Sequence, residues 1–214
     1  MSKPQIDYSV YLVTDDVCLQ GRPLLRCVEK ALQGGVTLVQ YRSKHKDGGS
    51  MYQEALALKS LCDKYLVPLI INDRVDLALA VGAAGVHVGQ SDLPCAAVRK
   101  IVGKDFIIGV SAHNVEEALQ AVAAGADYLG CGAVFGTATK ADASMLGLEN
   151  LRKIRSAVKL PIVGIGGVNA ENYSQVLSTG ANGAAIISGI LGADKIKDTT
   201  EKFAAIHRQL QEHN

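Results

Sequence analysis

The sequence predicts an α/β protein with one domain over residues 1–214, a (β/α)8 (TIM) barrel. A phrase in which an Ala- and Leu-rich helix ends at glycine and leads into an apolar strand recurs four times. Further short apolar runs lie between the copies, and no linker or shift in composition divides the chain. Apolar strands that alternate with helices form parallel sheets, and eight such units close most naturally into a barrel. A doubly wound open sheet is the alternative.

The recurring phrase supplies four of the expected strands, and its copies span residues 31–40, 80–88, 121–129 and 176–187. Each copy contains a glycine, which adopts the positive φ that ends many helices. The other strands are expected at the apolar runs of residues 8–13, 69–71, 106–110 and 162–165. In chain order, strands and helices therefore alternate along the whole sequence.

Length and composition limit the possible functions. A chain of 214 residues, 48% of them hydrophobic, buries one large core. The net charge of +1 provides no broad basic surface for nucleic acid. No apolar run approaches the roughly 18 residues of a membrane span, and the N-terminus has no apolar leader. Five cysteines without a C-x-x-C spacing indicate reduced thiols. A cytoplasmic protein is expected, with no membrane partner, as a monomer or a homo-oligomer.

Polar residues follow the apolar runs, at the strand ends where barrel enzymes carry their chemistry. The segments are residues 40–44, 72–74, 89–92, 111–113, 132–140, 164–167 and 187–189. In the last two, Gly166 and Gly167 expose backbone N–H groups and Ser188 opens a short helix. Either segment alone could be a tight turn. Together, after the last two strands, they predict a phosphate site.

Charged residues in these segments indicate a second anion site that contains a metal. Arg42, Lys44 and Lys140 bring positive charge, whereas Asp73 and Asp92 follow neighbouring strands. Mg²⁺ prefers one or two carboxylates together with water and substrate phosphate oxygens. The set therefore predicts a metal–pyrophosphate site, and two phosphorylated groups, on one substrate or two, fit the barrel mouth.

Simpler structural roles are the alternatives for single residues. Asp73 could pair with Arg74 or cap the next helix, and Asp92 could cap the helix that begins near Pro94. His87 lies within an apolar run, so we expect it to line the barrel with both ring nitrogens hydrogen-bonded rather than to act as a catalyst.

The polar segments, in their order along the chain, resemble the thiamine phosphate synthase family from about Tyr11 to Ile190. The motifs that carry the resemblance are Gln40-x-Arg42-x-Lys44, Ile71-Asn-Asp-Arg-Val-Asp-Leu-Ala78, Gly85-Val-His-Val-Gly-Gln-Ser-Asp92, Gly109-Val-Ser-Ala-His113, Thr137-Ala-Thr-Lys140, Val163-Gly-Ile-Gly-Gly-Val168 and Ile187-Ser188. The resemblance implies a transferase of thiamine biosynthesis. Such an enzyme joins a hydroxymethylpyrimidine pyrophosphate to a thiazole phosphate, with Mg²⁺, and releases pyrophosphate.

The resemblance also implies roles for individual residues. The pyrimidine pyrophosphate would contact Gln40, Tyr41, Arg42, Ser43, Lys44, Asn72, Ser111 and Lys140. The thiazole phosphate would contact Thr137, Ala138, Thr139, Gly167, Ile187 and Ser188. Asp73 and Asp92 would hold Mg²⁺, and Arg42, Lys44 and Lys140 would be catalytic because they stabilise charge on the leaving group. Ala133 and Gly136 stand where the family commonly has proline, which predicts a less restricted loop.

Three other functions remain as alternatives. A thiazole tautomerase resembles this family in fold and phosphate site but needs no pyrophosphate. A barrel enzyme for a phosphorylated sugar could form a Schiff base at Lys44 or Lys140. A non-catalytic barrel could bind a phosphorylated metabolite. The combination of Asp73, Asp92 and Lys140 favours the synthase.

Overall fold

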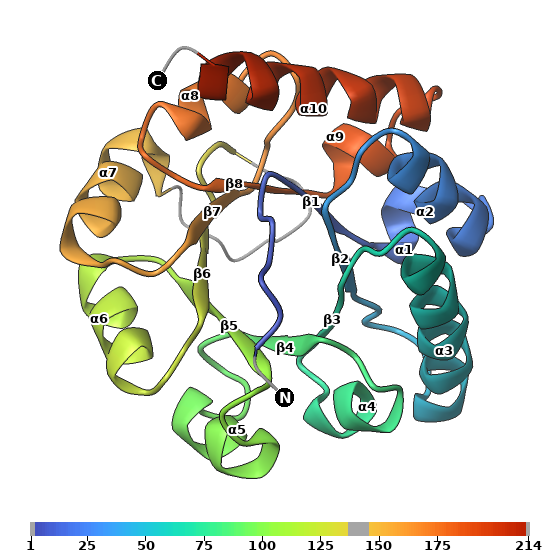
Figure 1. Cartoon of the computed structure of the whole chain (residues 1–214), viewed down its shortest axis with the longest axis horizontal. Coiled ribbons are helices and arrows are strands. Elements are labelled where there is room, and N and C mark those ends of the chain that lie inside the picture. Colours follow the sequence, from blue (N-terminus) through green and yellow to red (C-terminus); the bar gives the residue numbers. More distant parts are fainter. Residues whose placement is uncertain (1–2, 137–145, 213–214) are drawn as a thin grey trace.

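The computed structural model describes residues 3–136 and 146–212, and over these residues it is a closed barrel of eight parallel strands (Figure 1). The strands pair in chain order, and β8 pairs with β1 to close the sheet. They are β1 (Val10–Val13), β2 (Leu38–Tyr41), β3 (Leu69–Asn72), β4 (Gly85–Val88), β5 (Ile107–Ala112), β6 (Tyr128–Gly132), β7 (Ile162–Ile165) and β8 (Gly183–Ile186). The predicted (β/α)8 barrel is confirmed, and the open sheet is excluded.

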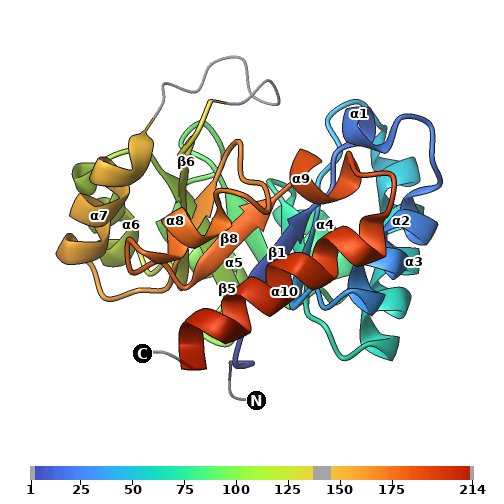
Figure 2. The same cartoon turned by 90° about the horizontal axis from the view of Figure 1, so that it is seen from above.

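Helices surround the barrel on all sides (Figure 1). They are α1 (Asp16–Leu19), α2 (Leu24–Gln33), α3 (Gly48–Lys64), α4 (Val75–Ala80), α5 (Cys95–Val102), α6 (Val115–Ala123), α7 (Gly147–Ala157), α8 (Tyr173–Leu177), α9 (Ser188–Leu191) and α10 (Ile196–Glu212). The short helices α1 and α9 lie at the same end of the barrel (Figure 2). Among the described residues, no helix is long and apolar enough to cross a membrane.

Four glycines end helices as predicted. Gly35, Gly82, Gly125 and Gly180 have φ values of 100°, 63°, 88° and 85°. Side chains are disfavoured in this left-handed region, so glycine lets the chain turn from each helix into the following strand. The recurring phrase in the sequence is therefore the αβ connection of the barrel.

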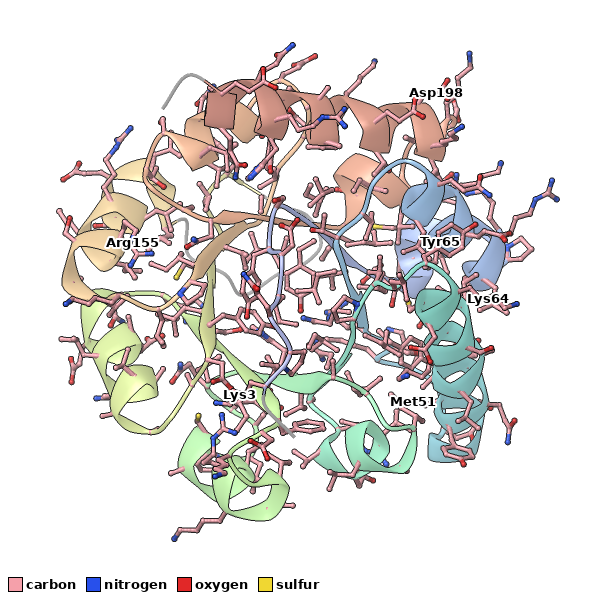
Figure 3. The ribbon with its side chains drawn as sticks, in the orientation of Figure 1. Lys3, Met51, Lys64, Tyr65, Arg155 and Asp198 are labelled. Carbon is pink, nitrogen blue, oxygen red and sulfur yellow. The ribbon has the colours of Figure 1, made fainter. Side chains whose placement is uncertain are left out.

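Side chains fill the barrel on both sides of the sheet (Figure 3). The alternation of side chains along a strand sends one set inward and the next outward. The inner set is a compact cluster formed by Tyr8, Tyr11, Val13, Leu38, Ile70, Ile107, Tyr128, Val163 and Ala185. The larger outer set packs between strands and helices. All five cysteines are free thiols, and four of them are buried.

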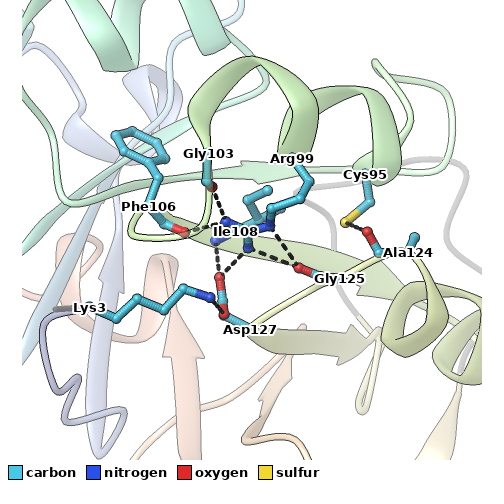
Figure 4. Close-up of polar contacts among 9 residues, drawn as sticks. All are labelled: Lys3, Cys95, Arg99, Gly103, Phe106, Ile108, Ala124, Gly125 and Asp127. Carbon is cyan, nitrogen blue, oxygen red and sulfur yellow. Dashed lines mark hydrogen bonds and ion pairs between the residues drawn. The ribbon is translucent and has the colours of Figure 1, made fainter.

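An ionic network ties together the N-terminal ends of the strands (Figure 4). Arg99 donates to Asp127 Oδ2 at 2.6 Å and to three backbone carbonyl oxygens, those of Gly103, Phe106 and Gly125. Asp127 also accepts from the backbone N–H of Ile108 at 2.8 Å and pairs with Lys3. The network joins the loop after α5, the loop before β6 and the N-terminal segment, which crosses this end of the barrel (Figure 1).

Several strands end later than the apolar pattern predicts. Tyr41 lies within β2, one residue past the predicted segment, Asn72 lies within β3 and Ser111 within β5. The backbone ladder continues there, since Asn72 stands opposite His87 on the next strand. Polar side chains at these positions therefore sit on rigid strand ends rather than on loops. The run at residues 8–13 is a strand only from Val10.

Candidate active site

A pocket lies at the mouth of the barrel, where the strands end. Its empty volume is about 420 Å³, part of it open to solvent. Five predicted site residues from four different strands or strand ends line it: Gln40, Arg42, Asn72, Ser111 and Ile187. The structure thus brings together residues that lie far apart in the sequence, from Gln40 to Ile187.

Arg42 is a buried cation held by the first loop of the barrel. Its Nη1 lies 2.6 Å from Asp15 Oδ2, and both side chains are at most 10% exposed. The other oxygen of Asp15 accepts from Val17 N and Cys18 N and so caps α1. Thr14 Oγ1 bonds both the N–H and the carbonyl of Arg42. Asp15 is not in the predicted set, although it follows the first apolar run and the rule used for the other strands would have found it.

The residues that flank Arg42 in the sequence do not line the pocket with their side chains. Tyr41 points outward, and its hydroxyl donates to Glu54 Oε2 on α3 at 2.8 Å. The Ser43 hydroxyl donates to Asp16 at 2.7 Å, and Lys44 is exposed. In this structure the side chains of Tyr41 and Ser43 are turned away from the pocket, so any ligand contact at these two residues would come from the backbone.

The two predicted metal ligands lie side by side. Burial, followed by hydrogen bonding and repulsion from Asp92, raises the pKa of Asp73 to about 6, while Lys44 and Arg42 act in the opposite direction. Asp73 also has a left-handed backbone with φ of 61°, which is unusual for a residue with a side chain. Two carboxylates this close either share a proton or bind a cation between them. The raised pKa of Asp73 therefore fits a cation site.

The composition of this site favours a hard cation. Within residues 3–136 and 146–212, no group of three or more His, Cys, Asp and Glu side chains could hold a metal ion. A structural zinc site would need such a group. Mg²⁺ takes one or two carboxylates and completes its octahedron with water and substrate phosphate oxygens. Asp73 and Asp92, with basic groups nearby to hold an anion, fit Mg²⁺ in that form.

The capping alternatives for these aspartates are wrong. Arg74 pairs with Asp76 at 2.6 Å and not with Asp73. The N-cap positions of α4 and α5 are Arg74 and Pro94, and neither helix has a side-chain cap within the described residues. Asp92 instead accepts from the backbone N–H of Gly89 at 2.7 Å, which fixes it inside its own loop. Neither carboxylate is used to start a helix.

His87 lines the barrel, as predicted. It is 8% exposed, its Nδ1 lies 2.9 Å from the Tyr128 hydroxyl and its Nε2 lies 3.0 Å from Ser111 Oγ. Both ring nitrogens therefore have partners, and the prediction is confirmed. His87 and its partner Ser111 both line the pocket.

Glycine backbone forms the opposite wall of the barrel mouth. Gly166 and Gly167 have φ values of 100° and 65°. A Cβ at Gly166 would lie 2.7 Å from Ala133 Cβ, and one at Gly167 would lie 2.6 Å from the carbonyl oxygen of Gly136. Only glycine allows the loops after β6 and β7 to approach this closely. Ala133, 5% exposed and joined to Gly132 by a cis peptide bond, is thus held by packing against this wall.

The loop after β8 adjoins this wall. Ser188 begins α9 and is exposed, and Ile187 precedes it at the N-cap. A Cβ at Gly189 would overlap the carbonyl oxygen of Val168, so the loops after β7 and β8 touch. The structure therefore places Gly167, Ile187 and Ser188 near one another, as the predicted phosphate site requires. Four further predicted residues, Thr137, Ala138, Thr139 and Lys140, lie outside the described residues.

These features define a class of protein, a (β/α)8-barrel enzyme whose mouth is built for phosphorylated small molecules. The profile of the family described as thiamine monophosphate synthase matches residues 10–190. The chain therefore belongs to the thiamine monophosphate synthase family.

Individual relatives agree over nearly the full chain. A thiamine-phosphate synthase from Clostridium acetobutylicum is 54% identical over 90% of this chain and 92% of the relative. One from Ruminiclostridium cellulolyticum is 53% identical over 95% of this chain and 97% of the relative. The solved structure of a thiamine phosphate pyrophosphorylase from Pyrococcus furiosus has a TM-score of 0.89 and 41% identity, and the match covers 95% of this chain and 97% of that one.

Proposed function

We propose that this chain is a thiamine-phosphate synthase. It would transfer 4-amino-2-methyl-5-hydroxymethylpyrimidine from its pyrophosphate to a thiazole phosphate, with or without a carboxyl group, and release pyrophosphate. The observation that carries the proposal is the Asp73–Asp92 pair close to the buried Arg42, which lines the pocket, in a chain of this family. A thiazole tautomerase has no use for a cation site at a leaving pyrophosphate.

The proposed contacts follow the two sides of the mouth. Gln40, Asn72 and Ser111 would contact the pyrimidine ring, because they line the pocket. Arg42 and Lys44, together with Lys140, would bind the pyrophosphate, and Tyr41 and Ser43 would contribute only backbone atoms. The thiazole phosphate would contact Thr137, Ala138, Thr139, Gly167, Ile187 and Ser188. Asp73 and Asp92 would hold Mg²⁺, which when bound supplies positive charge to the pyrophosphate oxygens.

The proposed reaction needs no nucleophile from the protein. The bond between the pyrimidine methylene and the pyrophosphate oxygen breaks, and its electron pair leaves with the pyrophosphate. The electron-rich aminopyrimidine stabilises the resulting cation, and the thiazole nitrogen then donates its lone pair to the methylene carbon. Arg42 and Lys44 stabilise the negative charge that develops on the leaving group. The rigid strand ends orient the ring and exclude water.

The chain itself is proposed to act as one cytoplasmic domain. The described strands and helices all belong to the barrel or its surrounding helices. The five free thiols are compatible with a reducing compartment.

A two-substrate assay tests the proposed function. The purified chain is mixed with both substrates and Mg²⁺, and thiamine phosphate and pyrophosphate are measured together. We expect equal amounts of the two products, no product when either substrate is omitted, and no turnover in excess EDTA. Binding of both substrates without product would instead support the non-catalytic barrel. Trapping of a substrate by borohydride would support the Schiff-base enzyme.

A further inference from the structure

A chain of hydrogen bonds crosses the interior of the barrel beneath the pocket. Gln40 Nε2 donates to the Tyr11 hydroxyl at 2.6 Å, and the hydroxyls of Tyr11 and Tyr128 are 2.8 Å apart. The Tyr128 hydroxyl lies 2.9 Å from His87 Nδ1, and His87 Nε2 lies 3.0 Å from Ser111 Oγ. Four members of the chain, Gln40, Tyr11, His87 and Ser111, line the pocket. The middle members, Tyr11 and Tyr128, are at most 1% exposed.

Two glycines within strands make room for the rings of this chain. His87 on β4 and Tyr128 on β6 stand on either side of Gly109 in register, and a Cβ at Gly109 would overlap the Tyr128 ring. A Cβ at Gly130 would lie 2.9 Å from His87 Cε1. Glycine weakens a strand, so its presence here indicates that the positions of the rings matter. The chain of hydrogen bonds is thus built into the sheet.

The direction of the chain follows from counting hydrogens. Because Tyr11 accepts from the Gln40 amide, its own hydrogen goes to Tyr128, and the Tyr128 hydrogen goes to His87 Nδ1. A neutral histidine that accepts at Nδ1 carries its hydrogen on Nε2, so it donates to Ser111 Oγ. The hydroxyl hydrogen of Ser111 is then free to point into the pocket.

The opposite arrangement is unfavourable. If His87 Nδ1 carried a hydrogen, Tyr128 would have to accept it and donate towards Tyr11. Tyr11 would then accept from both Gln40 and Tyr128, and its own hydroxyl hydrogen would have no acceptor in the chain and could only point into the pocket, although Tyr11 is 1% exposed. A buried polar group without a partner is costly. The first arrangement gives each hydroxyl in the chain a protein acceptor except that of the partly exposed Ser111, so we assign the His87 hydrogen to Nε2.

We infer that Tyr11, Tyr128 and His87 are positioning residues that fix the hydrogen-bonding polarity of the pocket. With Nε2 of Gln40 engaged by Tyr11, its carbonyl oxygen is left as an acceptor, while Ser111 is left as a donor. A ring with an exocyclic amino group next to an unprotonated ring nitrogen matches this pair, because the amino group can donate to Gln40 and the ring nitrogen can accept from Ser111. A ring with a carbonyl next to an N–H presents the reverse pattern. The inference rests on the proposed function, which places the aminopyrimidine against Gln40 and Ser111.

Tyr128→Phe tests the inference by removing one hydroxyl from the middle of the chain. We expect kcat/KM for the pyrimidine pyrophosphate to fall about tenfold, the effect of misdirecting a single hydrogen-bonded pair. The KM for thiazole phosphate and the affinity for inorganic pyrophosphate with Mg²⁺ should stay within about twofold of wild type, because Tyr128 does not face those groups. Tyr173→Phe is the matched control. It removes an equally buried hydroxyl, one that bonds Ser9 and His207 away from the pocket, so it should change none of these values.

Two further measurements separate a positioning role from a structural one. Nitrogen-15 NMR of labelled histidine should show His87 with hydrogen on Nε2 at neutral pH, and a mixture of tautomers in Tyr128→Phe. His87→Gln can place an amide nitrogen near the former Nε2 and keep a donor to Ser111, whereas the shorter His87→Asn cannot. The Gln variant should therefore retain more of kcat/KM than the Asn variant.

Binding of unreactive rings tests the inference independently of turnover. Titration with 4-amino-2-methyl-5-hydroxymethylpyrimidine and with its 4-oxo analogue should give at least tenfold tighter binding of the amino compound, and Tyr128→Phe should reduce this preference. A protonated His87, hydrogen on Nδ1, equal binding of both rings, or an equal effect of Tyr173→Phe would overturn the inference. If the wild-type protein shows the expected ring preference and the expected tautomer but no turnover, only the proposed function is overturned.

Discussion

Replacing Asp73 with asparagine should make the metal-free protein more stable and inactivate it. The raised pKa of Asp73, about 6 against 3.8 for an unperturbed aspartate, means that the folded state binds this proton more tightly than the unfolded state. The contribution of Asp73 to the free energy of unfolding is therefore most favourable below pH 4, falls as the pH rises from about 4 to 6, and stays low above that. Asparagine keeps the shape of the side chain and removes the charge.

The size of the effect follows from the same pKa. A rise from 3.8 to about 6 corresponds to about 3 kcal/mol at pH 8, and solvent screening of a half-buried group reduces this to about 1–2 kcal/mol. For a protein of this size, Tm shifts by roughly 2–4 °C per kcal/mol. Asp73→Asn should thus raise Tm by about 2–8 °C at pH 8 in EDTA, and by nothing below pH 4.

Thermal melting with and without Mg²⁺ and inorganic pyrophosphate is the assay. The wild-type protein should gain stability that grows with the logarithm of the ligand concentration relative to Kd, about 2.7 kcal/mol at one hundred times Kd, and Asp73→Asn should gain almost none. Asp76→Asn is the control, since Asp76 is exposed and pairs with Arg74. Asp76→Asn should not raise Tm and should keep the full response to Mg²⁺. A lower Tm for Asp73→Asn at pH 8, or an unchanged response to Mg²⁺, would refute the paired-carboxylate site.

Three other predictions concern separate parts of the barrel. Ser188→Asp puts a negative charge at the proposed phosphate site, so the KM for thiazole phosphate should rise far more than the KM for the pyrimidine substrate; equal increases would show that the sites are misassigned. Lys140→Ala should lower kcat about a hundredfold, a loss on the order of 3 kcal/mol in the transition state, in a protein that circular dichroism shows to be folded. Wild-type kcat in that variant would remove Lys140 from the catalytic residues. Asp127→Asn should lower stability without changing either KM.

The barrel was predictable because its signal is local and repeated. Glycines such as Gly82 and Gly125 end helices through their own backbone conformation, and each apolar run extends over only a few residues. Strand ends were less predictable, because a ladder can continue through polar residues such as Asn72 when the neighbouring strand offers partners. The outward direction of Tyr41 follows from alternation once Gln40 is placed inside, so this position could have been assigned from the sequence.

The contacts that organise the candidate site were not predictable in the same way. Asp15 and Arg42 are 27 residues apart, and only the pairing of β1 with β2 brings them together. The Tyr11–Tyr128 contact spans 117 residues and requires the barrel to be closed. Amino-acid patterns report which residue types follow a strand, but the partner of a buried charge depends on the three-dimensional closure of the sheet. Chemistry at strand ends was therefore predicted better than the residues that position it.

Asp127→Asn should affect stability alone, because Asp127 and the pocket lie at opposite ends of the barrel. Asp127 lies where the strands begin, opposite the pocket, and accepts from Arg99 and from the Ile108 N–H with its side chain only 16% exposed (Figure 4). Neutralising it leaves Arg99 without its carboxylate, and breaking a largely buried pair costs about 2–4 kcal/mol. Tm should fall by roughly 4–16 °C. Lys3→Ala removes only the more exposed partner and should shift Tm by less than about 3 °C. If Asp127→Asn instead raised one KM selectively while Tm stayed the same, the network would be coupled to the pocket, and its role would not be confined to stability.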